Sequence, residues 1–245
     1  MFRRAFTESI PAQLLRTDMS TVDFHAHILP NADHGSGSLE ESLTQLSIAN
    51  RYGFDKIVAT PHFYPHKHNL SSFLSKREQC VSTLKRGLTS SAPAIAVGAE
   101  VLLCLNLNRL ENLSSLCIGS SNVIMLELPF NYFNEGYIDT VEAISNNGFN
   151  VLLAHADRYP KENIERLIEL GVSLQVNVSS LCKLVKRKNL FKWIEDGRVV
   201  ALGSDIHGTK ERNYKDFVSV QKRYPDEFNQ ISAASLKLWS KFKLM

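Results

Sequence analysis

Two histidines, His25 and His27, stand one residue apart at the end of an apolar stretch, and Asp205 and His207 repeat this spacing far along the chain. Residues two apart in a β-strand point to the same side, so each pair can present two side chains to one point. Imidazole and carboxylate groups without thiolates suit Mn, Fe or Zn ions. The residue types and their spacing therefore indicate a metal site.

The same arrangement recurs along the chain, because seven apolar runs each end in a polar residue. The runs are residues 22–27, 56–62, 94–100, 123–127, 151–155, 173–177 and 199–207. Their polar ends are His25 with His27, His62, Glu100, Glu127, His155, Asn177, and Asp205 with His207. If these runs are the parallel strands of a barrel, their carboxyl ends meet on one face. We therefore expect the polar ends to converge.

So many nitrogen and oxygen groups exceed the needs of one ion, and the pattern predicts a cluster of two or three metals. A buried carboxylate without a partner is costly, and a metal gives Glu100 and Glu127 that partner. Two ions about 3.5–4 Å apart can hold both oxygens of a phosphoryl displacement and generate hydroxide from bound water. The chemistry that best uses such a cluster is hydrolysis of a phosphate ester.

Helical patterns between the apolar runs predict an α/β fold with parallel strands. Ser38 and Glu41 form a capping box that opens one helix, and Gly53 ends it. Further helices are expected over residues 73–84, 137–147, 160–171 and 191–196. Leu238, Phe242 and Met245, at helical spacing, predict a C-terminal helix that packs on the barrel. Seven strands alternating with helices favour a distorted barrel over an open sheet.

The composition is that of an ordinary globular protein and excludes several function classes. The chain has 245 residues, 44% of them hydrophobic, and a formal net charge of +3. No apolar run approaches the ~20 residues of a membrane span, and the small, dispersed charge does not indicate nucleic acid binding. No signal peptide is recognisable, so we expect a cytoplasmic protein without membrane insertion. Residues 1–20 are interpreted as an N-terminal extension and residues 21–245 as one domain.

Six ordered motifs resemble a known superfamily. They are residues 23–35 (DFHAHILPNADHG), 59–62 (ATPH), 98–100 (GAE), 126–129 (LELP), 154–159 (AHADRY) and 203–207 (GSDIH). In this order they resemble the PHP (polymerase and histidinol phosphatase) superfamily, and most closely the manganese-dependent tyrosine phosphatases of bacterial capsule and exopolysaccharide clusters. The resemblance covers residues 21–212 and implies an α/β fold of the PHP type, a distorted seven-stranded barrel.

The resemblance also implies the residues of the site. The implied metal ligands are His25, His27, His62, Glu100, Glu127, His155, Asp205 and His207. They would hold two or three divalent ions, with Mn expected and Fe, Co or Zn as alternatives, and a metal-bound hydroxide would be the nucleophile. Glu100 is expected to bridge ions. Arg158 and Arg212 match arginines that bind the phosphate or assist the leaving oxygen, a role that suits the planar guanidinium. For Arg158 the alternative is an ion pair with Asp157 or Glu162.

The chain departs from the family at one position. Members usually have two consecutive aspartates before the glycine, and the second binds metal, whereas this chain has Asp33 and His34. We include His34 among the candidate ligands, because a neutral imidazole also binds metal, although it removes a negative charge and favours later metals. The alternatives are that Asp33 adapts to the role or that the third ion is weakly held.

The function implied by the resemblance is that of a metal-dependent protein-tyrosine phosphatase. Its substrate would be the phosphotyrosine tail of a bacterial tyrosine kinase that controls capsular or exopolysaccharide synthesis. Phe63, Tyr64, Tyr132 and Phe133 are candidates to line a cleft for the aromatic ring, with core packing as the alternative. Two other functions stay open: a phosphatase for a small metabolite such as histidinol phosphate, and a catalytically weak homologue that binds phosphorylated tails. The sequence does not indicate an oligomeric state.

Overall fold

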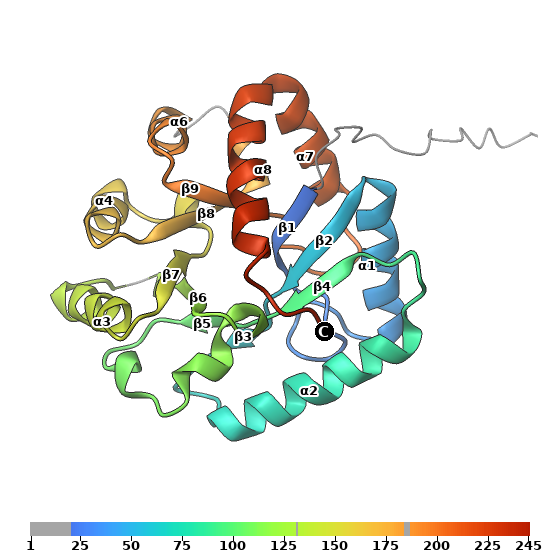
Figure 1. Ribbon diagram of the computed structural model, residues 1–245, viewed down its shortest axis with the longest axis horizontal. Coiled ribbons are helices and arrows are strands. Elements are labelled where there is room, and N and C mark those ends of the chain that lie inside the picture. Colours follow the sequence, from blue (N-terminus) through green and yellow to red (C-terminus); the bar gives the residue numbers. More distant parts are fainter. Residues whose placement is uncertain (1–20, 131, 184–186) are drawn as a thin grey trace, which may run out of the picture.

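The computed structural model describes residues 21–130, 132–183 and 187–245. The interpreted N-terminal extension, residues 1–20, lies outside the described residues. Strands occupy the middle of the molecule and helices surround them (Figure 1). None of the described helices combines the length and the apolar character needed to cross a membrane.

The strands form two sheets in which all neighbours are parallel. The three-stranded sheet contains, in this order, β1 (Thr21–Ala26), β2 (Phe54–Ala59) and β4 (Ala94–Val97). The six-stranded sheet contains, in this order, β3 (His62–Phe63), β5 (Glu100–Leu102), β6 (Val123–Glu127), β7 (Asn150–Leu153), β8 (Ser173–Asn177) and β9 (Val199–Gly203). The predicted α/β class with parallel strands is therefore confirmed.

The predicted single barrel of seven strands is not confirmed, because the described residues form nine strands in two sheets. Two of the predicted runs are divided: residues 56–62 into β2 and β3, and residues 94–100 into β4 and β5. Pro61 lies at the first break and has no N–H to donate to a sheet ladder. Backbone pairing continues past both breaks, since Gly98 N donates to Ala59 O at 2.9 Å and Glu100 N donates to Pro61 O at 3.0 Å.

The two sheets also meet beyond the ends of β1 and β9. Asp205 N donates to His25 O at 2.8 Å, and His27 N donates to Ile206 O at 3.2 Å. Apolar side chains from both sheets share one buried cluster, which includes Phe24 of β1 and Met125 of β6. The sheets therefore enclose a common interior, and segments from opposite ends of the chain lie side by side at the carboxyl ends of the strands.

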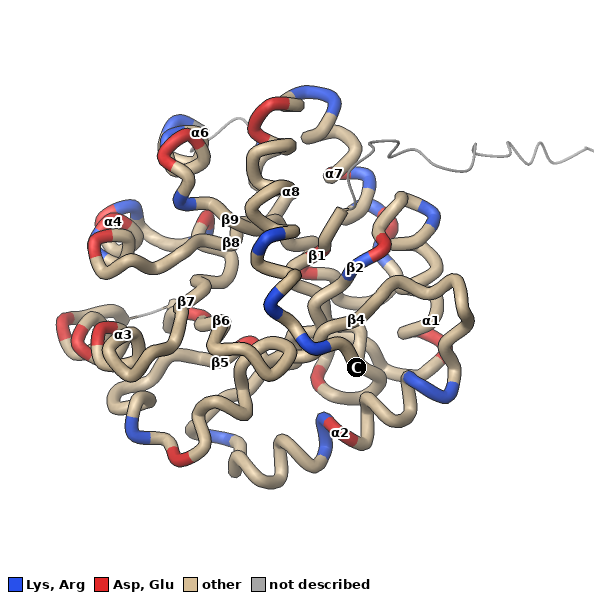
Figure 2. Tube along the Cα trace, in the orientation of Figure 1, with Lys and Arg blue, Asp and Glu red and all other residues tan. Residues whose placement is uncertain are grey.

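Eight α-helices cover the strands of the described chain. They are α1 (Leu39–Arg51), α2 (Leu70–Gly87), α3 (Glu135–Asn146), α4 (Lys161–Glu169), α5 (Val178–Leu181), α6 (Arg187–Glu195), α7 (Arg212–Arg223) and α8 (Pro225–Trp239). Helices α3, α4 and α6 lie outside the six-stranded sheet, and α8 packs on β1 and β9 (Figure 1). Charged residues gather on these helices while most strand residues are uncharged (Figure 2), which places the apolar core between helices and strands.

The predicted helix starts and stops agree in part with the structure. The Ser38 hydroxyl accepts from Glu41 N at 3.1 Å and caps α1, as predicted, and Gly53 follows that helix with φ 85°. The predicted C-terminal helix is wrong in its extent, because α8 ends at Trp239. Phe242 packs beyond the helix against Phe24, with ring centroids 5.9 Å apart. Leu238 lies in α8, and Phe242 and Met245 pack from the tail that follows it.

Candidate metal centre

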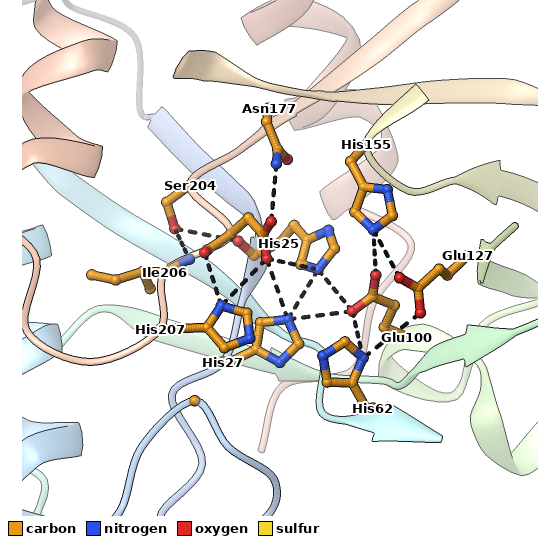
Figure 3. A network of polar contacts seen from close by, with 12 residues as sticks. His25, His27, His62, Glu100, Glu127, His155, Asn177, Ser204, Ile206 and His207 are labelled. Carbon is orange, nitrogen blue, oxygen red and sulfur yellow. Dashed lines mark hydrogen bonds and ion pairs between the residues drawn. The ribbon is translucent and has the colours of Figure 1, made fainter. Parts of the chain in front are cut away.

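The predicted ligands converge at the carboxyl ends of the strands, as Figure 3 shows. Parallel pairing sets His62 of β3 opposite Glu100 of β5, and Leu102 of β5 opposite Glu127 of β6. His25 and His27 come from β1 and the residue just beyond it, while His155, Asp205 and His207 lie directly after β7 and β9. His25, His27, His62, Glu100, Glu127 and His155 are buried. Segments separated by most of the chain thus supply one cluster.

Glu100 lies at the centre of this cluster. Its Oε1 lies 2.7 Å from His155 Nε2. Its Oε2 lies 2.9 Å from His62 Nδ1, 3.2 Å from His25 Nε2 and 3.3 Å from His27 Nε2. Glu127 is adjacent, with Oε1 3.5 Å from His155 Nε2. A single buried carboxylate therefore contacts four imidazoles, which are supplied by β1, β3 and β7 and the residues just after them.

The cluster fits divalent cations. Three sets of residues place their ligand atoms within 4.8 Å of one another: His25, His27 and Glu100; His62, Glu100 and Glu127; and His27, His62 and His207. These sets share His27, His62 and Glu100, an overlap that suits neighbouring ions with common ligands. His62 Nδ1, Glu100 Oε2 and His207 Nε2 are buried and make no well-aligned hydrogen bond, although Glu100 Oε2 lies close to the His62 ring. Unpartnered buried polar atoms are costly, and a cation among them removes that cost.

His34 stands apart from the other predicted ligands. It is exposed and belongs to none of the three sets. Its ring stacks at the rim on the rings of His62 and His207, with centroids 4.9 and 4.6 Å apart. Asp33, the alternative, points to His27 instead, with Oδ2 2.7 Å from His27 Nδ1. The aspartate thereby orients a neighbouring imidazole and turns that ring's Nε2 into the cluster.

Gln175 is a buried residue that the sequence reasoning missed. Its Oε1 accepts from His155 N at 2.7 Å and lies 3.1 Å from His25 Nδ1. A carbonyl oxygen only accepts, so His25 Nδ1 carries a proton and Nε2 is the ring nitrogen left to face the cluster. A side chain at Gly203 would collide with this arrangement, since its Cβ would lie 2.5 Å from both Gln175 Nε2 and His25 Cβ.

The orientation of the Gln175 amide is fixed by a chain of hydrogen bonds that ends at a carboxylate. Gln175 Nε2 donates to Asn177 Oδ1 at 3.1 Å, and Asn177 Nδ2 donates to Asp205 Oδ2 at 3.0 Å. Gln175 and Asn177 are two apart on β8 and so point to the same side. This alternation is a signal that the sequence contained. The pattern of polar strand ends predicts only Asn177, because Gln175 lies inside the strand.

Two residues of the cluster have unusual backbone angles. His155 and Asp205 have φ values of 33° and 50°, in the left-handed region that favours glycine. Their backbone N–H groups are held by Gln175 Oε1 and by His25 O respectively. Local strain of this kind persists where surrounding contacts over-determine it, and it is concentrated at functional sites.

The electrostatics of the cluster favour protons on imidazoles that face carboxylates. Burial alone would lower the pKa of His27, but Asp33 and Glu100 outweigh it and raise that pKa to about 10. Burial likewise opposes the charged form of His155, while Glu100 and Glu127 raise its pKa to about 9. Burial would raise the pKa of Glu100, yet the surrounding histidines hold it well below its usual value. Without metal, protons on these rings balance the buried carboxylates.

A cleft of about 780 Å³ opens over the cluster and contains both predicted arginines. Arg158 forms an ion pair with Asp205. The alternative pairing with Asp157 or Glu162 is wrong, because the partner is Asp205, while Asp157 accepts from Asn177 N at 2.8 Å and from the Ser180 hydroxyl at 2.6 Å. Arg212 is the first residue of α7 and is exposed at the cleft. Both guanidinium groups can therefore reach a ligand in the cleft.

The predicted aromatic lining is only partly correct. Tyr64 lines the cleft, whereas Phe63 is fully buried in the core, as is expected for packing. Tyr132 is exposed but is not part of the lining, and Phe133 packs partly buried against the core. Phe130, which the sequence reasoning did not select, lines the cleft.

A family model for capsular polysaccharide synthesis, CpsB/CapC, matches residues 21–230. The tyrosine-protein phosphatase YwqE of Bacillus subtilis (strain 168) is 26% identical over 208 residues, which cover 79% of this chain and 80% of YwqE. The tyrosine-protein phosphatase CpsB of Streptococcus pneumoniae is 25% identical over 213 residues, 78% of this chain and 84% of CpsB.

Solved structures share the fold. A structure from work on YwqE of Bacillus subtilis and CpsB of Streptococcus pneumoniae, described as metal-dependent tyrosine phosphatases, superposes with a TM-score of 0.72 at 20% identity and covers 91% of this chain and 96% of that one. A probable 2-pyrone-4,6-dicarboxylic acid hydrolase from Acinetobacter baumannii has a TM-score of 0.52 at 13% identity, covering 91% of this chain and 100% of that one.

Metal binding is expected to release about two protons near pH 7, because His27 and His155 must lose the protons that their raised pKa values retain. Both values lie above the usual 6.5. The protons therefore stabilise the metal-free fold fully below about pH 6.5, and that contribution is lost as pH rises through about 9 to 10. Titration calorimetry in buffers of different ionisation enthalpy measures the release. It should fade above pH ~9, and a release that stays constant from neutral pH to beyond that point contradicts the assignment.

Replacing Gln175 by Leu is expected to weaken metal binding about 10- to 100-fold, because His25 loses the acceptor that fixes its ring. Gln45→Leu is the matched control, since Gln45 is equally buried but its amide nitrogen contacts only the backbone carbonyls of His27 and Gly208. Circular dichroism checks that both variants are folded, and equilibrium dialysis with Mn²⁺ measures affinity. Equal losses in the two variants would assign the effect to burial rather than to ring orientation.

Proposed function

This chain belongs to the capsular polysaccharide synthesis family CpsB/CapC, and we propose that it is a metal-dependent protein-tyrosine phosphatase. The observation that carries this proposal is the Glu100 carboxylate among four imidazoles, with unpartnered ligand atoms at the floor of an open cleft. The relatives named as tyrosine phosphatases give the substrate class. We propose residues 21–245 as the catalytic domain, with its two sheets as the arcs of one distorted barrel.

The proposed metal ligands are the residues of the cluster. They are His25, His27, His62, Glu100, Glu127, His155, Asp205 and His207, with His34 available at the rim. Their donor set, imidazole and carboxylate without thiolate, suits two or three ions, with Mn preferred. When bound, the ions supply positive charge that favours attack by water on phosphorus and stabilises the charge on the phosphate oxygens. Asp33 and Gln175 hold the rings of His27 and His25 in the orientation that this requires.

Arg158 is proposed to bind the phosphate of the substrate. Its guanidinium already pairs with a carboxylate at the cleft floor. A phosphate can likewise accept two parallel hydrogen bonds from the planar guanidinium. Arg212, at the start of α7, is proposed to add further positive charge to the cleft. Because His34, Phe130 and Arg212 at the cleft are exposed, the site is open to a residue carried on a protein. The proposed substrate is the phosphotyrosine tail of a bacterial tyrosine kinase.

Phosphate release from a phosphotyrosyl peptide tests the function. Metal-stripped protein is expected to be inactive, and added Mn²⁺, Co²⁺ or Zn²⁺ should restore turnover, because the cluster binds the ions that the reaction needs. The same assay on histidinol phosphate serves as the comparison. Preferred turnover of histidinol phosphate would transfer the assignment to a metabolite phosphatase. Folded, metal-loaded protein that binds the peptide without releasing phosphate would indicate a catalytically weak binder.

Replacing Arg158 by Ala is expected to lower kcat/KM for the phosphotyrosyl peptide about 10- to 100-fold, because charge-assisted hydrogen bonds to the phosphate are lost. Arg166→Ala is the control, since Arg166 is an exposed arginine that pairs with Glu135 on the outer helices. Steady-state kinetics at saturating metal separates this loss from weaker metal binding. Unchanged kcat/KM in the Arg158 variant would remove this residue from the site.

A further inference from the structure

Phe130 is a large apolar side chain in an unusual place. It is 63% exposed and follows β6 at the edge of the cleft that contains the cluster. Its ring is nearly parallel to the His155 imidazole, with centroids 6.3 Å apart and planes 16° apart. It also contacts Tyr159, with centroids 5.9 Å apart. A neighbouring ring therefore covers one side of Phe130, and the side chain still presents much of its surface to the cleft.

Tyr64 has the corresponding position on a different strand. It follows β3, lines the same cleft, and its ring stacks on the His62 imidazole with centroids 5.1 Å apart and planes 19° apart. Its backbone N–H donates to His68 Nδ1 at 3.0 Å, and the Lys67 ammonium lies 5.2 Å from its ring centroid. These contacts hold the ring beside the cluster. Tyr64 and Phe130 are thus each stacked on a proposed metal ligand.

The two aromatic rings belong to one end of the cleft. His62 and His155, on which they stack, both contact Glu100 and both lie within 4 Å of Glu127. Among the cationic residues that line the cleft, Arg158 pairs with Asp205, and Lys210 and Arg212 come soon after Asp205 in the chain. The cleft therefore has an aromatic end beside Glu127 and a cationic end beside Asp205.

We propose that Tyr64 and Phe130 form an aryl-binding wall that makes this site select aryl phosphate esters over alkyl phosphate esters. The proposal rests on the proposed phosphatase function, because the cluster and Arg158 must hold the phosphate. With the phosphate there, an ester oxygen carrying a phenyl ring places that ring against the aromatic end. A serine or other alkyl ester leaves both rings uncovered. Tyrosine specificity then comes from these two side chains and not from the metal centre.

The strength of such contacts sets the size of the effect. A pair of aromatic rings contributes binding free energy beyond the area that it buries. Contacts of one substrate ring with both Tyr64 and Phe130 should together raise the affinity about tenfold. Because the contact is made equally in the bound substrate and during the reaction, its loss should raise KM and leave kcat nearly unchanged. Loss of a residue needed only for folding would not raise KM while leaving kcat unchanged.

The test uses two phosphonates that the enzyme cannot hydrolyse, so that the leaving group has no influence. Titration calorimetry on the full-length, metal-loaded protein gives the affinities for phenylphosphonate and methylphosphonate. Wild-type protein should bind phenylphosphonate about tenfold more tightly than methylphosphonate. In Phe130→Ala this ratio should fall severalfold, while methylphosphonate affinity and metal content stay unchanged. KM for the phosphotyrosyl peptide should rise in parallel.

Tyr132→Ala is the matched control. Tyr132 lies on the same loop and is 67% exposed, yet it is not part of the cleft lining, so its removal should leave the ratio unchanged. Equal affinities for the two phosphonates in wild-type protein, or an unchanged ratio in Phe130→Ala, would overturn the aryl wall while leaving the phosphatase intact. Absence of binding by either phosphonate, with metal bound, would contradict the phosphate site itself and the wall with it.

Discussion

The structure depends on keeping ionisable groups buried at one point. Glu100 and four imidazoles have little access to water, and such groups are tolerated only when every charge has a partner. In the metal-free protein, protons shared between imidazoles and carboxylates provide part of that balance. The unpartnered atoms of His62, Glu100 and His207 show where it is incomplete. In the proposed function divalent cations complete it, and binding them would then be coupled to the stability of the fold.

The rest of the architecture holds this cluster in shape. The parallel strands bring His62, Glu100 and Glu127 into register, and β1 meets the segment after β9 so that both ends of the chain contribute. Gln175 and Asn177 then connect His25 and His155 with Asp205. In this chain of hydrogen bonds each group donates to the next one toward the Asp205 carboxylate. These hydrogen bonds orient the ring nitrogens that face the cluster, and such orientation favours tight and specific metal binding.

Much of this site follows from the sequence, because strand ends and alternation are local properties. The positions of His25, His27, His62 and Glu100 are predictable on that basis, and so is the cap of α1. Contacts between distant segments are not. The sequence does not reveal that Arg158 pairs with Asp205 or that Gln175 orients two rings, since both depend on which strands become neighbours. The division of two runs at Pro61 and Gly98 and the extended C-terminal tail likewise depend on tertiary packing.

Diffraction data collected at the manganese absorption edge, from crystals grown with Mn²⁺, would test the central claim most directly. Two or three anomalous peaks should lie among the cluster, each within bonding distance of His27, His62 or Glu100, with Glu100 touching more than one. A peak bonded to His34 would assign the imidazole to the position usually held by aspartate. Anomalous peaks confined to surface carboxylates, with none beside Glu100, would contradict the account.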